Sequence, residues 1–211
     1  IYMIIPFNSI FNFILLTCRR YSIDESHGLL HSMDVLDKTN NIINYDPVLK
    51  KKSAFLDKEI IYTSALLHDM CDKKYMDEQL GVSSIQRFLL TDLKYEKKKV
   101  DVITNIINTM SYSKVKKNGF PEMENYQLEY NIVREADLLA AYDIDRAIIY
   151  NMTKSNTDFE TAFINSKLLY YDRMAKHNED NLFTFDYTKS EGDKLNAVCL
   201  QKIKDYNKML Q

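Results

Sequence analysis

A chain of 211 residues is long enough for one domain of upper-middle size and short for two independent cores joined by a linker. Hydrophobic residues make up 45% of it, which is enough for a sizeable core and excludes a mostly disordered protein. The 28 Lys and Arg residues against 30 Asp and Glu residues give a net charge of −2, so neither nucleic acid nor an anionic membrane is expected as the primary partner.

Helices are the expected elements throughout, because four Gly and three Pro residues supply few of the turns that hairpins, sandwiches and barrels need. The first apolar stretch contains Pro6 and several polar residues, and no basic residue precedes it. These features argue against a signal peptide and a membrane span, so we expect a packed helix from Asn8 or Ser9 to about Arg20.

A second helix is expected from a cap at Asp24 or Ser26 toward Ile43. It includes His27 and His31, which are four residues apart and therefore share one helix face. Two imidazoles within one turn form the first candidate site of the chain.

A third, apolar helix begins at a cap on Asp57 and ends at His68 and Asp69. The end of this helix brings an imidazole and a carboxylate out of the core side by side. Ser83 and Gln86 have the spacing of a capping box, which predicts that a further helix opens at Ser83.

The second half of the chain alternates helical patterns with two loops. An amphipathic helix is expected over about residues 97–110, followed by a loop over residues 111–122. A long helix is expected over about residues 124–152, and a second loop over residues 178–186. No internal repeat or linker divides the sequence, so we expect one domain over residues 1–211.

The three cysteines are widely spaced and fit neither a disulfide framework nor a CxxC zinc pair. This pattern favours the cytoplasm or another reducing intracellular compartment.

Three polar motifs follow one another along the predicted helices: His31-Ser-Met-Asp-Val35, Ala65-Leu-Leu-His68-Asp69 and Glu135-Ala-Asp137-Leu-Leu-Ala-Ala-Tyr142. Their order resembles that of the HD-domain phosphohydrolase superfamily, in which His, His-Asp and Asp lie on a helical bundle. Ser26-His27 and Leu29-Leu30 also resemble the opening of the compact single-domain HD hydrolases. The resemblance covers about residues 10–150 and implies an all-α, HD-domain helical bundle that the C-terminal helices complete.

The resemblance assigns His31, His68, Asp69 and Asp137 as ligands of a divalent metal ion, with Mn, Mg, Fe, Co, Ni and Zn all open. Two neutral imidazoles and two carboxylates leave such a cation near charge neutrality, with positions for water and substrate. On the residues alone, His68-Asp69 also fits a core histidine held by a carboxylate, and Asp137 also fits an ion pair with Arg134.

Asp72 and Lys73 are the expected catalytic residues. The resemblance implies an acidic residue near Asp72 that accepts or donates a proton beside the metal-bound water. Lys73 and Lys74 can meet substrate phosphates as point charges, and a solvated loop is the alternative for both.

His27 is expected to bind a second metal, hold a substrate phosphate or orient His31. Asp34 stands where the compact HD hydrolases commonly have arginine, and Arg146, on the same predicted helix as Asp137, can supply a replacement charge. Four further polar residues of the second half are candidates to line a pocket, although most residues of these types lie at the surface: Arg134, Arg173, His177 and Lys189.

We therefore expect a metal-dependent phosphohydrolase that acts on a small phosphorylated molecule, with a nucleotide as the favoured class and phosphomonoester and pyrophosphate bonds both open. A non-catalytic HD scaffold that binds a nucleotide or a protein partner is the alternative. A di-iron oxygenase of this fold needs more histidines than the four present. Short lysine runs without interleaved aromatic residues favour solvated faces over a nucleic-acid surface, and a homodimer stays open.

Overall fold

The computed structural model describes residues 5–211, so residues 1–4 of the expected domain lie outside the described part. The elements of residues 5–211 are all helical, which confirms the all-α prediction. The first six helices are α1 (Phe7–Tyr21), α2 (Leu29–Tyr45), α3 (Pro47–Lys52), α4 (Lys58–Leu67), α5 (Glu78–Arg87) and α6 (Lys97–Thr109). The later helices are α7 (Tyr112–Asn118), α8 (Gln127–Ala140), α9 (Ile144–Ser155), α10 (Phe159–Asp172) and α11 (Asp186–Met209).

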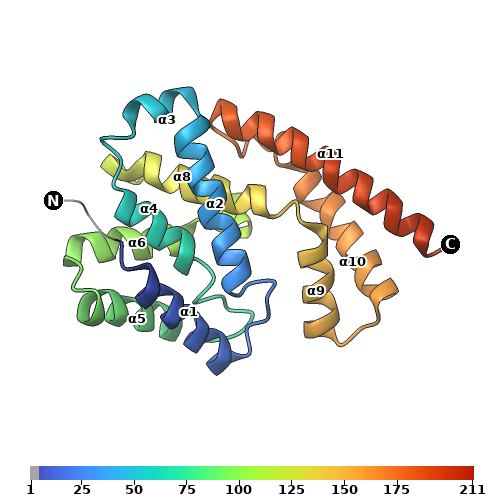
Figure 1. The fold of residues 1–211 in the computed structure, drawn as a ribbon, viewed down its shortest axis with the longest axis horizontal. Helices are drawn as coiled ribbons and strands as arrows, with labels where there is room; N and C mark the ends of the chain where they lie inside the picture. The colour runs from blue at the N-terminus through green and yellow to red at the C-terminus, as the bar shows by residue number, and fades with distance from the viewer. Residues whose placement is uncertain (1–4) are drawn as a thin grey trace.

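Helix α2 lies at the centre of the fold, where it packs against α4 and α8 (Figure 1). Helix α4 joins this core because its apolar residues are fully buried, and each large one contributes about 1.5–3 kcal/mol. Asp57 caps α4 as predicted, since its carboxylate accepts the backbone N–H groups of Glu59 and Ile60. The helix ends at His68, which places the His-Asp pair at the edge of the core.

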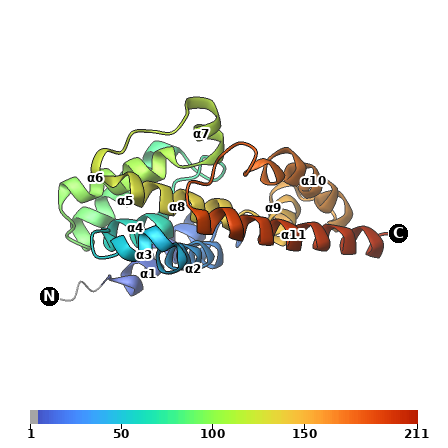
Figure 2. The ribbon, with the colours of Figure 1, turned by 90° about the horizontal axis from the view of Figure 1, so that it is seen from above.

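Helices α9 and α10 pack on each other beside the body formed by α1 to α8 (Figures 1 and 2). The long helix α11 runs along both parts and contacts α2, α8 and α9. Helix α11 therefore joins the two parts.

Two predicted helix starts are wrong. Helix α1 begins at Phe7 after Pro6, and no side chain caps it, so neither Asn8 nor Ser9 has that role. Helix α5 begins after Asp77, whose carboxylate accepts the backbone N–H of Leu80. Ser83 lies inside this helix, because the earlier aspartate already supplies the cap.

The second helix also starts later than predicted. Gly28 is the N-cap of α2, so His27 lies in the preceding turn and does not share a helix face with His31. The predicted long helix over residues 124–152 is two helices, α8 and α9, because the chain turns after Ala140 and the carboxylate of Asp143 caps α9 through the N–H of Asp145. Arg146 and Asp137 therefore belong to different helices.

One of the two predicted loops contains a helix in the structure, and the other is a loop. The segment 111–122 contains the short helix α7, so the prediction of a continuous loop is wrong there. The amphipathic helix near residues 97–110 is confirmed as α6, and the loop before α11 ends at Phe185, one residue earlier than predicted.

A buried polar network ties α8 to the segment that leads into α11. The guanidinium of Arg134 donates to the carbonyl of Leu182 at 2.5 Å and to the carboxylate of Glu135 at 3.0 Å. Glu135 also accepts from the backbone N–H of Thr184 at 2.9 Å and from the hydroxyl of Thr188 at 2.5 Å. Arg134 thus pairs with Glu135, so the alternative of an ion pair between Arg134 and Asp137 is wrong.

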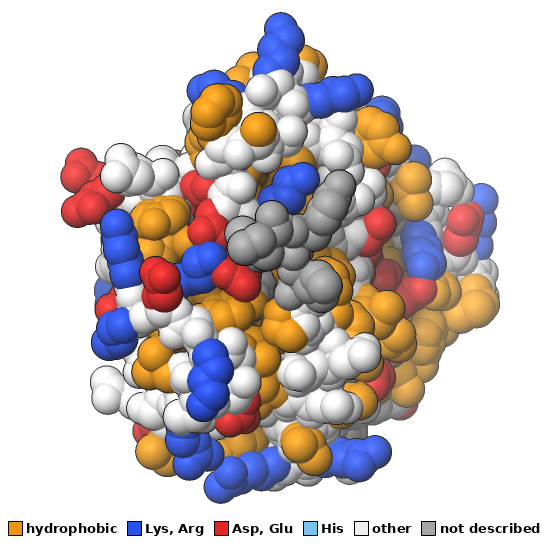
Figure 3. All heavy atoms as spheres, turned by 60° about the vertical axis from the view of Figure 1, so that its left-hand side comes forward, with side chains coloured by type: hydrophobic (Ala, Val, Ile, Leu, Met, Phe, Trp, Pro, Cys, Tyr) orange, Lys and Arg blue, Asp and Glu red, His pale blue; other side chains and the backbone are white. Residues whose placement is uncertain are grey.

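The molecular surface mixes charge types. Basic, acidic and apolar side chains alternate over the face drawn in Figure 3. None of the helices within residues 5–211 combines the length and apolar character needed to cross a membrane. Cys18, Cys71 and Cys199 are all free, in line with the expectation of no disulfide framework.

Candidate metal centre

Two imidazoles from different helices meet in the core. His31 lies in the first turn of α2, and His68 directly follows α4. Their Nε2 atoms are 3.0 Å apart, and both residues are buried. The packing of α2 against α4 therefore turns two distant histidines into one site.

Two carboxylates complete the cluster. An Asp69 oxygen lies 3.3 Å from the Nε2 atoms of both histidines, and an Asp137 oxygen lies 3.5 Å from His31 and 3.6 Å from His68. The donor atoms of His31, His68 and Asp69 all lie within 4.8 Å of one another, and Asp137 adjoins this group through the two histidines. The four predicted ligands thus lie together in the structure.

The separations fit a shared divalent cation. Ligand atoms about 2.1 Å from one cation lie about 3.0 Å apart at right angles and about 3.4 Å apart at tetrahedral angles. The two imidazole nitrogens are 3.0 Å apart, and each carboxylate has an oxygen 3.3 to 3.6 Å from both of them, so the two histidines fit such a geometry with either carboxylate. Two nitrogen and two oxygen donors suit Mn²⁺, Fe²⁺, Co²⁺, Ni²⁺ or Zn²⁺ better than the oxygen-preferring Mg²⁺.

The backbone orients one of these ligands. His68 Nδ1 lies 2.8 Å from the carbonyl oxygen of Ala65, so this nitrogen donates its hydrogen there. In the neutral ring, the Nε2 lone pair then points into the cluster. A ligating histidine usually makes this second hydrogen bond, because it fixes the ring and its tautomer.

The cluster has a strong attraction for positive charge. Burial lowers the pKa of His68, but the charge of Asp69 and hydrogen bonds to both carboxylates together raise it well above its ordinary value. Burial raises the pKa values of Asp69 and Asp137, but the neighbouring histidines bring both well below their usual range. The two carboxylates therefore remain anionic at neutral pH and can balance a bound cation.

His27 belongs to a second polar network next to the cluster. Its ring centre is 6.3 Å from that of His31, and its Nε2 accepts from the ammonium of Lys74 at 2.8 Å. Its Nδ1 lies 2.6 Å from the hydroxyl of Ser26 and 3.1 Å from that of Tyr75. Burial lowers the pKa of His27 to about 4, helped by the charge of Lys74, so the ring is neutral near pH 7.

Asp72 lies at the edge of the site, outside the four-residue cluster. Its carboxylate is 3.2 Å from the Lys74 ammonium and 4.0 Å from His27 Nε2. Lys73 is exposed, and it lines the same cavity as Asp72 and Lys74. This placement differs from that of a ligand and agrees with contact to a molecule in the cavity.

Arg146 reaches the cluster from the opposite part of the fold. Although it lies on α9, its Nη1 is 2.5 and 2.6 Å from the two ring nitrogens of His31. No carboxylate of residues 5–211 lies within 4 Å of its guanidinium, in contrast to Lys74. Arg146 therefore places an unpaired positive charge beside the cluster.

A cavity of about 390 Å³ opens beside these residues, between the end of α4 and helices α9 and α10. One wall contains His68, Asp69 and Asp137. Its lining carries five Lys and Arg side chains, Lys73, Lys74, Lys114, Arg146 and Arg173, and five carboxylates, Asp69, Asp72, Glu78, Asp137 and Asp143. Lys74 and Lys114 pair with two of these carboxylates, whereas neither arginine has a carboxylate of residues 5–211 within 4 Å, so the arginines can bind an anionic ligand.

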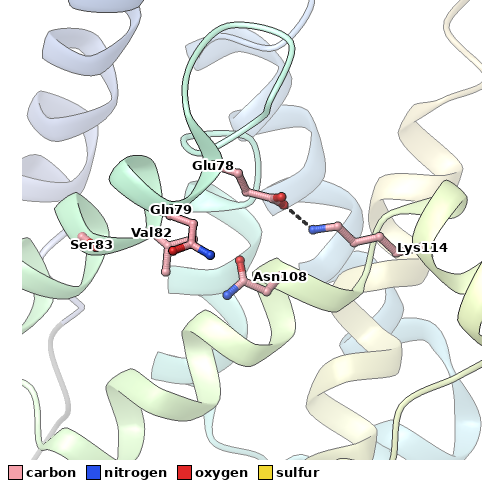
Figure 4. A pocket seen from close by; sticks show the side chains of 6 residues that line it. All are labelled: Glu78, Gln79, Val82, Ser83, Asn108 and Lys114. Atoms are coloured by element: carbon pink, nitrogen blue, oxygen red, sulfur yellow. Dashed lines mark hydrogen bonds and ion pairs between the residues drawn. The ribbon is translucent and has the colours of Figure 1, made fainter.

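A second pocket of about 300 Å³ adjoins the cavity, and the two share Glu78 and Lys114 (Figure 4). These two side chains point toward one another and form an ion pair. Gln79, Ser83 and Asn108 provide most of the remaining polar lining. The ion pair therefore forms part of the boundary between the pockets.

Four cavity residues had weak or no signals in the sequence. Of the four polar candidates for a pocket lining, Arg173 and His177 line the cavity, whereas Arg134 is buried in the α8 network and Lys189 is exposed. Tyr112 and Tyr150 were not predicted. The helices α7, α9 and α10 bring these residues in by packing, and no local spacing marks them.

The chain is similar to solved bacterial structures over almost its whole length. A Bacillus subtilis protein, YpgQ, matches with a TM-score of 0.65 and 22% identity over 95% of this chain and 93% of that one. A Lactobacillus plantarum structural-genomics protein matches with a TM-score of 0.69 and 18% identity over 96% and 95%. YpgQ in complex with ADP matches with a TM-score of 0.64 and 23% identity over 95% and 96%. No family model and no curated protein matches the sequence, so these likenesses establish the fold alone.

Proposed function

We propose that this protein is an HD-type, metal-dependent phosphohydrolase acting on a small phosphorylated molecule, with a nucleotide as the favoured substrate class. The proposal rests mainly on the cluster of His31, His68, Asp69 and Asp137 at the wall of a cavity that two arginines also line. A divalent cation at this cluster supplies an activated water and charge neutralisation at a phosphoryl oxygen, which phosphate hydrolysis requires.

The residues around the cluster have separate roles in this proposal. The four cluster residues hold the cation, and the Ala65 carbonyl keeps His68 in the ligating orientation. Arg146 binds phosphoryl oxygens, because its guanidinium has hydrogen-bond donors beside the cluster and no carboxylate partner among residues 5–211. The substrate phosphate is thereby held between the cluster and α9.

Asp72 is the proposed proton-transfer residue. It lines the cavity near the cluster and remains outside the group of donor atoms, as a general acid or base requires. Lys74 pairs with its carboxylate and contacts His27, so this lysine and histidine position Asp72. Lys73, exposed at the cavity, supplies a further positive charge to the substrate phosphate.

The nucleotide preference is supported by one similar structure, and the departure at Asp34 does not weaken it. The similar structure of YpgQ contains ADP, a phosphorylated ligand whose anionic groups suit the arginines of this cavity. The departure at Asp34 does not affect the cavity, because this residue pairs with Lys38 at the surface of α2 at 3.2 Å. The missing arginine therefore leaves the lining of the site unchanged.

A metal-supplemented screen against nucleotides and simple phosphate esters tests the proposal. Phosphate and pyrophosphate are assayed separately, which identifies the bond that is cleaved. The matched variants are Asp69→Ala and the surface control Asp34→Ala, whose side chain is 43% exposed. We expect Asp69→Ala to lower turnover by more than about 100-fold, because loss of a ligand should exceed the usual effect of losing a supporting residue.

The control should retain wild-type turnover. Absence of hydrolysis with every metal and substrate, or equal turnover in Asp69→Ala and the wild type, contradicts the proposal. Nucleotide binding without turnover would favour the scaffold function instead.

A further inference from the structure

The basic residues of the cavity differ in whether a carboxylate neutralises them. Lys74 pairs with Asp72 at 3.2 Å, and Lys114 pairs with Glu78. Arg173 lines the same cavity, but no carboxylate oxygen of residues 5–211 lies within 4 Å of its guanidinium. It is thus a second unpaired arginine in addition to Arg146.

Arg173 is held on an aromatic platform. Its guanidinium carbon lies 4.5 Å from the ring centre of Tyr112, within the range of a cation–π contact. The Tyr112 hydroxyl donates to Asp180 at 3.3 Å, which fixes the ring against the segment before α11. This stacking limits the orientations of the guanidinium before any ligand arrives.

The Arg173 guanidinium is partly buried and close to another positive charge, so its lack of a carboxylate partner costs free energy. Burial lowers the pKa of its guanidinium, and the Arg146 charge acts in the same direction. The nearby charge of Asp137 attracts Arg173, but that carboxylate is engaged with the two cluster histidines. A partly desolvated cation in this position is stabilised by an anion that enters the cavity.

The residues that line the cavity indicate which kind of anion binds at Arg173. Arg173 and the cluster residue Asp137 line one continuous cavity, and Arg146 also lines it. In the proposed function Arg146, which contacts His31, binds the phosphate at the cluster, and this leaves the Arg173 guanidinium for another group of the ligand. Guanidinium donors match the oxygens of a phosphate group in a fork geometry that lysine does not provide.

We propose that Arg173, stacked on Tyr112, forms a second anion subsite that binds a phosphate group of the ligand other than the one at the metal cluster. The proposal rests on the proposed function for the first phosphate alone. Arg173 would then distinguish ligands with two linked phosphates from those with one.

Non-hydrolysable ligands test this subsite independently of turnover. Methylenediphosphonate carries two linked phosphonates, and methylphosphonate carries one. The dissociation constant of each is measured by calorimetry on Mn²⁺-loaded wild type, Arg173→Met and the control Arg87→Met, which removes an exposed arginine of α5. We expect Arg173→Met to weaken the diphosphonate by about 10- to 100-fold, the usual effect of losing a charged hydrogen bond, and methylphosphonate by less than about 3-fold.

Two further variants separate ligand binding from a structural role. Arg173→Lys keeps the charge without the fork and should give an intermediate loss of diphosphonate affinity. Tyr112→Leu removes the platform and should also give a partial loss. Unfolding temperature is recorded for each variant, because a purely structural Arg173 changes stability without changing the ratio of the two affinities.

The subsite is overturned if wild type binds the diphosphonate no more tightly than methylphosphonate, or if Arg173→Met leaves the ratio unchanged. An Arg173→Met protein that does not fold leaves the decision to Arg173→Lys, where an unchanged ratio also overturns the subsite. Failure of the proposed function has a different signature, since it removes turnover of every phosphate ester in the wild type.

Discussion

The Nε2 atoms of His31 and His68 lie 3.0 Å apart, although 37 positions separate the two residues in the chain. His68 uses its Nδ1 hydrogen on the Ala65 carbonyl, so the Nε2 of the neutral ring has a lone pair that faces the other imidazole. A hydrogen on the His31 Nε2 or a bound cation would satisfy this lone pair, and the His31 Nε2 also lies 2.6 Å from Arg146 Nη1. The Asp69 carboxylate, 3.3 Å from both nitrogens, supplies negative charge that stabilises a cation at this place.

Chelation of divalent metal should lower the thermal unfolding temperature of the wild-type protein. The four cluster residues come together only in the folded chain, so a cation at about 100 times its Kd adds about 2.7 kcal/mol to stability. Asp69→Asn should lose most of this metal-dependent shift, and the surface variant Asp34→Asn should keep it. Differential scanning calorimetry with and without Mn²⁺ checks this, and equal shifts in all three proteins would contradict it.

Asp72→Asn should separate proton transfer from metal binding. We expect turnover to fall by about 10²- to 10⁴-fold, the usual contribution of a positioned acid or base, while metal content and substrate affinity stay near wild type. Steady-state kinetics at saturating Mn²⁺, paired with elemental analysis, measures both properties. Parallel loss of metal and activity would make Asp72 a ligand, and loss of neither would return it to a solvated loop.

We expect His177 to make the free energy of unfolding depend on pH below about pH 7. Burial lowers its pKa to about 4, helped by the Arg173 charge, whereas the unfolded residue takes up a proton near its ordinary pKa of about 6.5. Between these values the unfolded chain binds more protons, so stability falls as pH drops from about 6.5 to about 4. The full effect is on the order of 3 kcal/mol.

Urea unfolding of wild type and His177→Gln at pH 7 and pH 4.5 isolates this contribution. The wild type should lose more stability than the variant over this interval, because glutamine does not titrate. Identical losses would show that His177 does not remain neutral in the folded protein.

Glu135→Gln should destabilise the fold at a residue that does not line the cavity. The change leaves Arg134 buried without its charge partner, which typically costs about 3–5 kcal/mol. Glu179→Gln is the matched control, because Glu179 is exposed. Urea unfolding measures both, and a loss below about 1 kcal/mol in Glu135→Gln would indicate that the network with Thr184 and Thr188 contributes little.

The sequence predicted helices where local capping and periodicity decide the structure. Asp57 and the apolar residues of α4 are one case, because cap and buried face agree. The break between α8 and α9 was missed, since Tyr142 and Ile144 are buried and continue the apolar pattern across the turn. The capping carboxylate of Asp143 is the local signal that marks the break.

The candidate site was predictable to the extent that its residues follow a recognisable order. The order of His31, His68-Asp69 and Asp137 predicted a cluster, and the structure places these side chains together. Tyr112 and Arg173 lie 61 positions apart on elements that meet only through packing, so no spacing could pair them. The basic lining beyond the cluster is therefore a property of the tertiary structure.

Metal titration of phosphate release is the most direct test of the claim that His31, His68, Asp69 and Asp137 hold a catalytic divalent cation. Chelated wild type and Asp137→Asn are assayed with the best substrate of the screen over a series of Mn²⁺ concentrations. We predict no release without metal, saturable recovery in the wild type, and recovery in Asp137→Asn only at concentrations at least about 10-fold higher. Full hydrolysis by the chelated wild type, or superimposable metal curves for the two proteins, would contradict the account.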